Sequence, residues 1–442
     1  MTRFKGSDLL ALGFMTFALF LGAGNIIFPA SAGMASGDNF WPVAIGFLLT
    51  GVGLPALTIV ALARVGGGMP ELTSPLGRVA GIALAVTVYL AIGPLFATPR
   101  TAVVSFEIGV APFTGGSWEA LLGYSVIYFA VVLYLVMNPG RLLDRVGKVL
   151  TPLLLVALLL LGGAAIFAPI GPVGPVMVDY QAAPLLKGFL DGYLTMDAFG
   201  ALVFGIVIAS AIRDRGVTSP DLVTRYSIIA VIIAAIGLAV VYLLLFYLGA
   251  TSYGVAQGAR NGGQILTAYV QHTFGTPGLL LLAAVIVLAC LTTGVGLITA
   301  CGEFFSRLMG VSYRAAAVVF VLFSLVVSNL GLSELIRISI PVLVGLYPLA
   351  IVLVLLSLAD HLWRSPSRVL RPVMAVTFVF GLADGLGASG IERLENLVPG
   401  VFTRLPWAEQ SMGWVLPVVC VLALAILVDR LLPAVAEKAA QH

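Results

Sequence analysis

Long apolar stretches, bounded by charged, proline or glycine residues, recur along the whole of this sequence. A transmembrane helix needs about 20 predominantly apolar residues, and many of these stretches reach that length. We expect twelve spans, near residues 8–33, 40–64, 79–110, 119–138, 146–168, 186–211, 225–250, 276–306, 314–331, 337–359, 369–387 and 411–432. The sequence therefore predicts an all-α polytopic membrane protein with 12 transmembrane helices.

The composition agrees with a chain that lies mostly in a bilayer. Of 442 residues, 60% are hydrophobic and 10% are charged, and the mean hydropathy is +1.11, whereas about 25% of residues are charged in soluble domains. Lys and Arg residues concentrate in alternate loops, on the side that carries the N-terminus, and cytoplasmic loops hold most such residues in membrane proteins. We therefore expect both termini to be cytoplasmic. Lipid surrounds such a protein, and neither a nucleic-acid partner nor a protein partner is implied.

Neither an enzyme site nor a channel pore is evident in the sequence. The cysteines and histidines are too scattered for a metal site. A catalytic site needs His, Asp, Glu or Cys at matching spacing, and a channel needs repeated carbonyls or rings of charge. We therefore expect a carrier that is not an enzyme.

The first apolar stretch contains a glycine-rich interruption, FLGAGN, at Phe20–Asn25, and Pro29 follows it. In hydrocarbon every backbone N–H and C=O needs a partner, so a bend at bilayer depth is tolerated only where it is buried in protein or lines a polar cavity. An unwound helix offers free amides at one half-helix end and free carbonyls at the other, and secondary transporters bind carboxylates and cations in this way. The alternative is that Gly22 and Gly24 only let a neighbouring helix pack closely.

The sixth apolar stretch is also interrupted, because its middle reads DGYLTMDAFG at Asp191–Gly200. Two broken helices five spans apart, one starting inside and one outside, are the pattern of an inverted repeat with the substrate between its halves. We expect a single transmembrane transporter domain over residues 1–442. Its first repeat is residues 1–168 (helices 1–5), its inverted second repeat is residues 183–359 (helices 6–10), and residues 369–432 form accessory helices 11 and 12.

Charged side chains inside the predicted spans mark the site further. Burying an ionised group at bilayer depth costs at least ~2.5–3.5 kcal/mol, so such a group normally faces a partner or water. Asp197 lies near the centre of span six, Arg100 lies in the outer half of span three, and Glu107 lies near the outer end of that span. Arg100 either forms a structural ion pair with Asp197 or Asp191 or binds the substrate directly, and both interpretations stay open here.

Four sequence motifs make the chain resemble a known family of transporters. They are MTFALFLGAGNIIFP at Met15–Pro29, IGPLFATPRTA at Ile92–Ala102, VSFE at Val104–Glu107, and GYLTMD at Gly192–Asp197. With these residues the sequence closely resembles the BrnQ-type branched-chain amino acid:cation symporters of bacterial inner membranes, a branch of the amino acid–polyamine–organocation group. The likeness covers essentially the whole chain. It implies a LeuT-like 5+5 inverted repeat with broken helices 1 and 6, and uptake of leucine, isoleucine and valine coupled to sodium.

The resemblance also implies roles at the two breaks, through the match of the GAGN motif to the Gly-x-Gly-Asn break of LeuT-type transporters. The amides of Ala23 and Gly24 would hold the substrate carboxylate. The carbonyls around Thr195 and Met196, in the unwound part of span six, would receive the α-ammonium group. The side chain of Asn25, next to the carboxylate site, could serve a second cation.

The same match implies a sodium site, formed by the carbonyls of Ala18 and Leu21 and by the hydroxyls of Thr292 and Thr293 in span eight. Hydroxyl oxygens suit a small hard cation, although a Thr in a membrane helix usually bonds its own backbone. Sodium would then be the coupling ion. Asp197 has no counterpart of equal charge in LeuT-type proteins, so its role at the substrate stays open.

The rest of the cavity should be apolar, because an aliphatic side chain favours an apolar wall. We expect aromatic residues of spans one and six in that wall, namely Phe20, Phe28, Tyr193, Phe199 and Phe204. A hydrophobic pocket separates substrates that differ by one methylene by only ~1–3 kcal/mol, which predicts overlapping transport of the three amino acids. The alternatives on the same scaffold are proton coupling, or transport of another small amino acid or a nucleobase.

Overall fold

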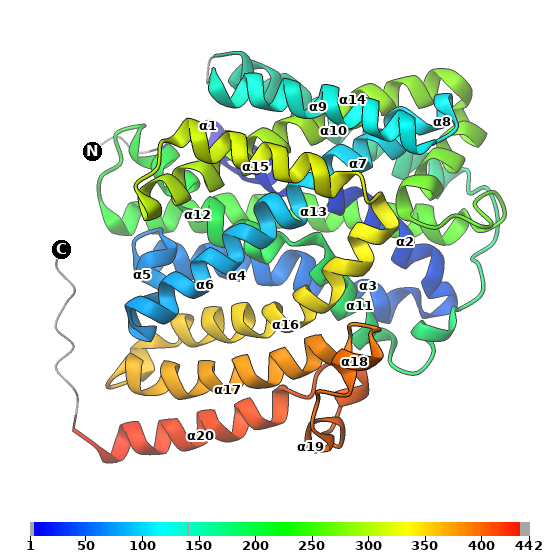
Figure 1. Cartoon of the computed structure of the whole chain (residues 1–442). Helices are drawn as coiled ribbons and strands as arrows, with labels where there is room; N and C mark the ends of the chain where they lie inside the picture. Colours follow the sequence, from blue (N-terminus) through cyan, green and yellow to red (C-terminus); the bar gives the residue numbers. More distant parts are fainter. Residues whose placement is uncertain (1–3, 139–140, 434–442) are drawn as a thin grey trace.

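The computed structural model describes residues 4–138 and 141–433, and the side chains of these residues other than 141–151. The chain is built of helices, and the described residues contain no strand (Figure 1), which confirms the all-α fold class. The predicted spans fall on α1 (Gly6–Phe20), α2 (Ala23–Ser36), α3 (Phe40–Leu48), η2 (Leu49–Gly53), α4 (Leu54–Val65), α6 (Arg78–Leu90), η4 (Ala91–Leu95), α7 (Ala97–Gly109), α9 (Trp118–Met137), α10 (Arg141–Phe167), α11 (Pro184–Asp191), η6 (Gly192–Thr195), α12 (Asp197–Arg213), α13 (Pro220–Thr251), α14 (Gly262–Met309), α15 (Tyr313–Ser328), α16 (Leu332–Leu358), α17 (Pro366–Gly387) and α20 (Val415–Leu431). Short helices connect them, namely η1 (Gly37–Asn39), α5 (Met69–Thr73), η3 (Ser74–Leu76), α8 (Ala111–Thr114), η5 (Val178–Tyr180), η7 (Asp360–Leu362), α18 (Glu392–Glu395), α19 (Gly400–Thr403) and η8 (Ala408–Gln410).

Each of the twelve predicted spans coincides with helical segments. Within the described ranges, seven segments are long and apolar enough to cross a membrane, and the bent pair Pro184–Thr195 and Asp197–Arg213 makes an eighth. Other predicted spans fall on shorter apolar helices, among them α1 and α15. The predicted start of span eight at residue 276 lies directly after Gly275, whose non-helical dihedral angles (φ 61°, ψ −159°) separate the rest of α14 from a first part that Asn261 caps and that begins at Gly262.

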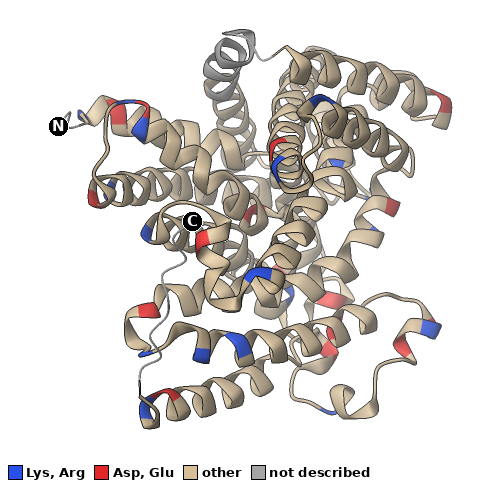
Figure 2. Ribbon diagram, turned by 60° about the vertical axis from the view of Figure 1, so that its left-hand side comes forward, with Lys and Arg blue, Asp and Glu red and all other residues tan. Residues whose placement is uncertain are grey.

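The helices run roughly side by side, and the start of α1 and the end of α20 lie on the same side of the molecule (Figure 1). Charged residues are sparse and lie mainly at helix ends and in loops (Figure 2). The predicted accessory helices, α17 and α20, lie at one edge of the bundle, where α17 packs against α16 (Figure 1). The approach is close at Gly381, where a Cβ atom would lie 2.7 Å from the carbonyl oxygen of Gly345.

The first predicted break is present between α1 and α2. Leu21 has non-helical dihedral angles (φ −70°, ψ 83°), and Gly22 is extended (φ −107°, ψ −171°). The N–H of Gly22, which would bond the carbonyl of Ala18 in a continuous helix, instead donates to Oδ1 of Asn25 at 3.1 Å. The Asn25 side chain therefore stabilises the break, and it leaves the Ala18 carbonyl without its helical partner.

The second predicted break is present between α11 and α12. Met196 adopts a left-handed conformation (φ 62°) between the end of η6 and the start of α12, and the two halves of the span are bent by 44°. A non-glycine residue in this conformation is uncommon and must be held by its surroundings. Gly192 permits close packing against span two, because a Cβ atom there would lie 2.0 Å from Oγ1 of Thr50.

The two breaks contact each other at Gly24. A Cβ atom at this position would lie 3.4 Å from Cα of Thr195 and 3.3 Å from the ring of Phe28. At Gly22 the nearest atoms would be 3.5 Å away, which is an ordinary contact distance. Gly24 therefore does allow close packing, as the alternative interpretation of the glycines proposed, and this packing places the two breaks at one site.

Candidate functional site

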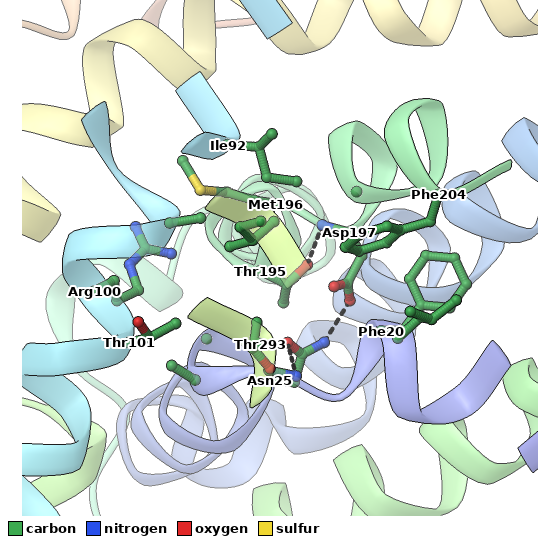
Figure 3. Close-up of a pocket in the computed structure, with 17 residues that line it drawn as sticks. Phe20, Asn25, Ile92, Arg100, Thr101, Thr195, Met196, Asp197, Phe204 and Thr293 are labelled. Carbon is green, nitrogen blue, oxygen red and sulfur yellow. Dashed lines mark hydrogen bonds between the residues drawn. The ribbon is translucent and has the colours of Figure 1, made fainter. Parts of the chain in front are cut away.

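A cavity of about 50 Å³ lies where the two helix breaks meet (Figure 3). Backbone and side chains of both breaks form its wall together with α7 and α14. The predicted site residues that line it are Ala23, Gly24, Asn25, Arg100, Thr195, Met196, Asp197 and Thr293, and two of the predicted aromatic residues, Phe20 and Phe204, line it as well. The structure thus brings residues from spans one, three, six and eight to one place.

Asn25, Asp197 and Tyr242 form a hydrogen-bonded triangle beside the cavity. Nδ2 of Asn25 donates to Oδ2 of Asp197 at 2.6 Å and also to the Tyr242 hydroxyl, and that hydroxyl donates to the same Oδ2 at 2.7 Å. All three residues are buried, with at most 5% of their surface exposed. Because they belong to α2, α12 and α13, the triangle joins both breaks to a third helix.

Arg100 lines the cavity together with Asp197 but does not contact that carboxylate (Figure 3). Its Nη1 donates to the carbonyl of Leu194 at 2.6 Å, and its Nη2 donates to Oγ of Ser339 at 3.3 Å. Among the described residues no carboxylate lies within 4.0 Å of its guanidinium group. Of the two interpretations left open for Arg100, the ion pair with Asp197 or Asp191 is therefore not present, because a carbonyl exposed by the unwound part of span six takes the place of a carboxylate.

The other charged residues of the predicted spans lie outside the cavity wall. Asp191 pairs with Lys187, one turn earlier, and accepts a hydrogen bond from the Tyr180 hydroxyl at 2.8 Å. Burial, reinforced by the Asp191 carboxylate, raises the pKa of Tyr180 well above its ordinary value, so the phenol remains a donor. Glu107 accepts a hydrogen bond from Asn261 at 2.9 Å, which ties α7 to the start of α14.

The predicted sodium ligands are only partly brought together. Thr293 lines the cavity, and its Cγ2 lies 3.5 Å from the place where a Cβ of Gly22 would stand. Thr292 lies outside the wall, and its hydroxyl donates to a carbonyl of its own helix at 2.8 Å. Ala18 and Leu21 lie in the last turn of α1 and directly after it, next to the break but not in the cavity wall.

Three of the predicted aromatic lining residues lie behind the wall. The ring of Tyr193 stacks on that of Tyr347 with centroids 4.1 Å apart, and Phe199 contacts the same ring at 4.6 Å. The ring of Phe28 lies under the guanidinium group of Arg100, whose Cζ is 5.0 Å from its centroid. These rings support the wall rather than form it, because tyrosine and phenylalanine side chains pack here against each other and against Arg100.

Several residues of the site were not predicted. Leu19, Ile92 and Leu297 are apolar wall residues. Leu297 follows Thr293 by one helical turn, so the helical period could have placed both on one face. Tyr242 carried a signal as well, since a tyrosine hydroxyl inside a long apolar stretch needs a hydrogen-bond partner.

Comparisons of the sequence with known proteins find close relatives. Residues 5–432 match the family described as Branched-chain amino acid transport protein. The chain is 69% identical over 432 residues to the branched-chain amino acid transport system 2 carrier protein of Pseudomonas aeruginosa, with 98% of each chain covered. It is 53% identical to the branched-chain amino acid permease BrnQ of Salmonella typhimurium, with 97% of each chain covered.

Comparisons of the structure find the same architecture at low sequence identity. A mutant of the Eremococcus coleocola manganese transporter superposes with a TM-score of 0.60 at 16% identity, with 97% of each chain covered. Mhp1, a nucleobase-cation-symport-1 family transporter, superposes with a TM-score of 0.58 at 14% identity, with 97% of this chain and 94% of Mhp1 covered. At these identities the likeness concerns the fold, and it confirms the predicted LeuT-like fold.

Proposed function

The chain belongs to the branched-chain amino acid transport protein family, and on this premise we propose that it takes up leucine, isoleucine and valine by symport with sodium. It is a membrane transport protein and not an enzyme. One observation carries the choice of an amino acid as substrate. A buried cation, Arg100, and a buried carboxylate, Asp197, line one cavity and are not paired with each other. An unpaired buried charge is costly, and a zwitterion supplies a partner to each.

The carboxylate end of the substrate is assigned to α2 and α7. Ala23 and Gly24 are the first two residues of α2, so their N–H groups lie at the positive end of a helix and have no partner within it. Arg100 lies in the same wall, and its Nε has no hydrogen-bond partner within the described part of the chain. Backbone amides and a guanidinium group together favour an anion at this end of the cavity.

The ammonium end is assigned to the second break. The left-handed turn at Met196 interrupts helical hydrogen bonding, and this leaves the Thr195 carbonyl to accept from a ligand, whereas the Met196 carbonyl already accepts the N–H of Gly200 at 2.9 Å. Asp197 adds a negative charge at the same end. A nucleobase carries no such pair of opposite charges, which favours an amino acid over the nucleobase alternative.

The aliphatic side chain is assigned to the apolar part of the wall. Phe20, Ile92, Phe204 and Leu297 supply it, from both breaks, η4 and α14. A cavity of about 50 Å³ has room for a few water molecules only. Binding of leucine therefore requires these side chains to move outward, as expected of a carrier that opens its site to one side at a time.

The coupling ion is assigned to the space between the end of α1 and α14. The carbonyls of Ala18 and Leu21 and the hydroxyl of Thr293 supply uncharged oxygen atoms next to the first break. Hard oxygen ligands suit a small cation such as sodium. Thr292 was predicted as a fourth ligand, but it contributes to this site only if its side chain leaves its helical carbonyl.

The two repeats are assigned to residues 1–168 and 183–359, with 369–432 as accessory helices in a single transporter domain. Residues 1–3, 139–140 and 434–442 lie outside the described residues. The two breaks belong to different repeats and meet at the cavity, so movement of one repeat against the other would open the site alternately to each side. We assign the protein to the bacterial inner membrane with both termini cytoplasmic.

Uptake of labelled leucine into proteoliposomes that contain the purified protein tests this function. We expect an inward sodium gradient at fixed pH to drive accumulation, and we expect excess isoleucine or valine to compete. Liposomes without protein and vesicles with sodium on both sides are the controls. Uptake driven by a proton gradient and indifferent to sodium would contradict the sodium assignment and make Asp197 the leading proton carrier, whereas uptake of nucleobases but not of amino acids would contradict the substrate.

A further inference from the structure

We propose that Tyr242 positions Asp197 for recognition of the α-ammonium group, and that this positioning sets the preference for an amino acid over its keto-acid analogue. This inference rests on the proposed function and deepens it, because it assigns one charge of the substrate to one oxygen atom. Tyr242 does not line the cavity and acts on the substrate only through Asp197.

The carboxylate of Asp197 has two oxygen atoms with different surroundings. Oδ2 accepts hydrogen bonds from both Asn25 and Tyr242, at 2.6 and 2.7 Å. In Figure 3 the other oxygen is directed away from the bond to Asn25, and Asp197 lines the cavity. Each carboxylate oxygen has about two acceptor positions, so two donors fill Oδ2 and leave Oδ1 for the ligand. The orientation of the carboxylate therefore decides which oxygen meets the substrate.

The Tyr242 hydroxyl holds the Asp197 carboxylate in this orientation, because Tyr242 itself is firmly packed. It is fully buried, its ring is in edge contact with that of Phe47 at 5.4 Å, and it lies inside α13, an unbroken helix of 32 residues. Asn25 and Asp197 instead lie in the first turns of two helices that begin at breaks. Because Tyr242 lies on a continuous helix, removal of its hydroxyl deletes the donor that is anchored away from both breaks and leaves Asn25 as the remaining described donor to Oδ2.

The triangle also connects the ammonium end to the carboxylate end. Asn25, which donates to Asp197, accepts at its Oδ1 the N–H of Gly22 and thereby stabilises the first break. An ammonium group on Oδ1 of Asp197 is therefore linked through three hydrogen-bonded groups to the backbone that presents the amides of α2. Substrates that lack the ammonium group do not complete this arrangement.

Competition between leucine and 4-methyl-2-oxopentanoate in proteoliposomes tests the inference. The two compounds share the carboxylate and the aliphatic chain, and only leucine has an ammonium group. We expect Tyr242→Phe to raise the KM for leucine about tenfold, the effect of losing one hydrogen bond to a charged group, while the inhibition constant of the keto acid changes less than about twofold. Asp197→Asn should reduce the preference for leucine further.

Tyr269→Phe is the matched control. Tyr269 is also fully buried, its hydroxyl has no hydrogen-bond partner among the described residues, and it does not line the cavity, so both constants should stay unchanged. Tyr242→His retains an N–H donor and is expected to keep a preference for leucine between those of the wild type and Tyr242→Phe. It provides the second test if Tyr242→Phe yields too little folded protein.

Three results would overturn the inference: an unchanged KM in Tyr242→Phe, equal weakening of leucine and the keto acid, or a histidine variant no better than the phenylalanine variant. Failure of the proposed function is separable from these results. If the wild type carries a different amino acid, the proposed substrates are wrong, and that amino acid and its own keto acid decide the role of Tyr242. If the wild type carries solutes without an ammonium group, both the function and the inference fail.

Discussion

Gly24 is the residue at which the first break touches the second. A side chain at Gly24 must fit between the ring of Phe28 and the backbone of Thr195. These atoms lie 3.3 and 3.4 Å from the position that the Cβ atom would take. We predict that Gly24→Leu abolishes leucine uptake and leaves the protein inserted in the membrane, because the larger side chain separates the breaks and covers the first amides of α2.

The control for Gly24→Leu is the same substitution at Gly123. Gly123 lies on the exposed face of α9, and a Cβ atom there meets nothing within 4 Å. Folded yield from size-exclusion chromatography and uptake are measured for both variants. Normal uptake by Gly24→Leu would show that the first break is not part of the binding site. Loss of folded protein in that variant alone would show that Gly24 has a packing role.

Thr293 and Thr292 are adjacent residues with different surroundings, and this difference makes the sodium assignment testable. Thr293→Val keeps the shape of a wall residue and removes one oxygen atom, so we predict that about tenfold more sodium is needed for half-maximal leucine uptake. Thr292→Val should leave that concentration unchanged, because the Thr292 hydroxyl already bonds its own helix. Equal effects of both substitutions, or an effect of Thr292→Val alone, would contradict the assignment.

At the residue scale the sequence predicted which residues belong to the site better than it predicted their partners. Gly24, Asn25 and Asp197 could be found because polar or flexible residues inside an apolar stretch are conspicuous. Their hydrogen bonds could not, since Asn25 and Tyr242 are 217 positions apart and meet only through the packing of α2 on α13. Arg100 is an example. The sequence offers carboxylates as candidate partners for its guanidinium group, but it does not show that unwinding exposes the Leu194 carbonyl, which is the partner found.

At the scale of single helices, the two breaks were predictable and some boundaries were not. Both breaks lie where glycine and polar residues interrupt apolar runs, and such interruptions are visible in one sequence. The helical part of α14 that precedes the kink at Gly275 was not predicted, because this part, which begins at Gly262, is more polar than a membrane span. The rings of Tyr193 and Phe199 were misplaced for a similar reason, since composition does not tell which face of a half-helix meets the cavity.

The helices α17 and α20 cap each other through carboxylates, of which Asp429 is buried and Asp384 is half-buried. Asp429, near the end of α20, accepts from the backbone N–H groups of Arg364 and Ser365 at 2.7 and 3.0 Å, just before α17 begins. Asp384, near the end of α17, accepts from the N–H of Trp414 at 3.3 Å, just before α20 begins. A negative charge at a helix N-terminus satisfies unpaired amides and is favoured by the helix dipole.

We predict that Asp429→Ala lowers the thermal unfolding temperature of the purified protein by several degrees and leaves the KM for leucine unchanged. The loss corresponds to about 2 kcal/mol for two hydrogen bonds to a buried charge, and neither α17 nor α20 lines the cavity. Glu409→Ala, at an exposed position in the same region of the chain, is the control for general effects of removing a carboxylate. A KM that rises several-fold in Asp429→Ala would show that these helices are not accessory to binding.

At the scale of the whole molecule, the site depends on two broken spans, one from each of the two proposed repeats. Each break alone exposes a few amides or carbonyls, and only their contact at Gly24 and Thr195 creates a cavity with both kinds of group. The sequence indicated this arrangement through the spacing of the breaks and the distribution of Lys and Arg. It could not give the size of the cavity, which depends on how the side chains of Phe20, Phe204 and Leu297 pack.

If the two proposed repeats run in opposite directions, their first spans must begin on opposite sides of the membrane, and labelling from one side tests this. The starts of α1 and α11 lie at opposite ends of the bundle (Figure 1). Gly6, at the start of α1, and Ala182, just before α11, are both exposed, so a cysteine at either is accessible to a maleimide. We predict that a membrane-impermeant maleimide labels Ala182→Cys in intact cells and labels Gly6→Cys only after permeabilisation. Both cysteine variants also carry Cys420→Ala, because Cys420 is the exposed one of the three native cysteines and would itself be labelled. The reverse pattern would place the termini outside and contradict the orientation inferred from the charged loops, and labelling of both in intact cells would contradict the opposed directions of the two halves.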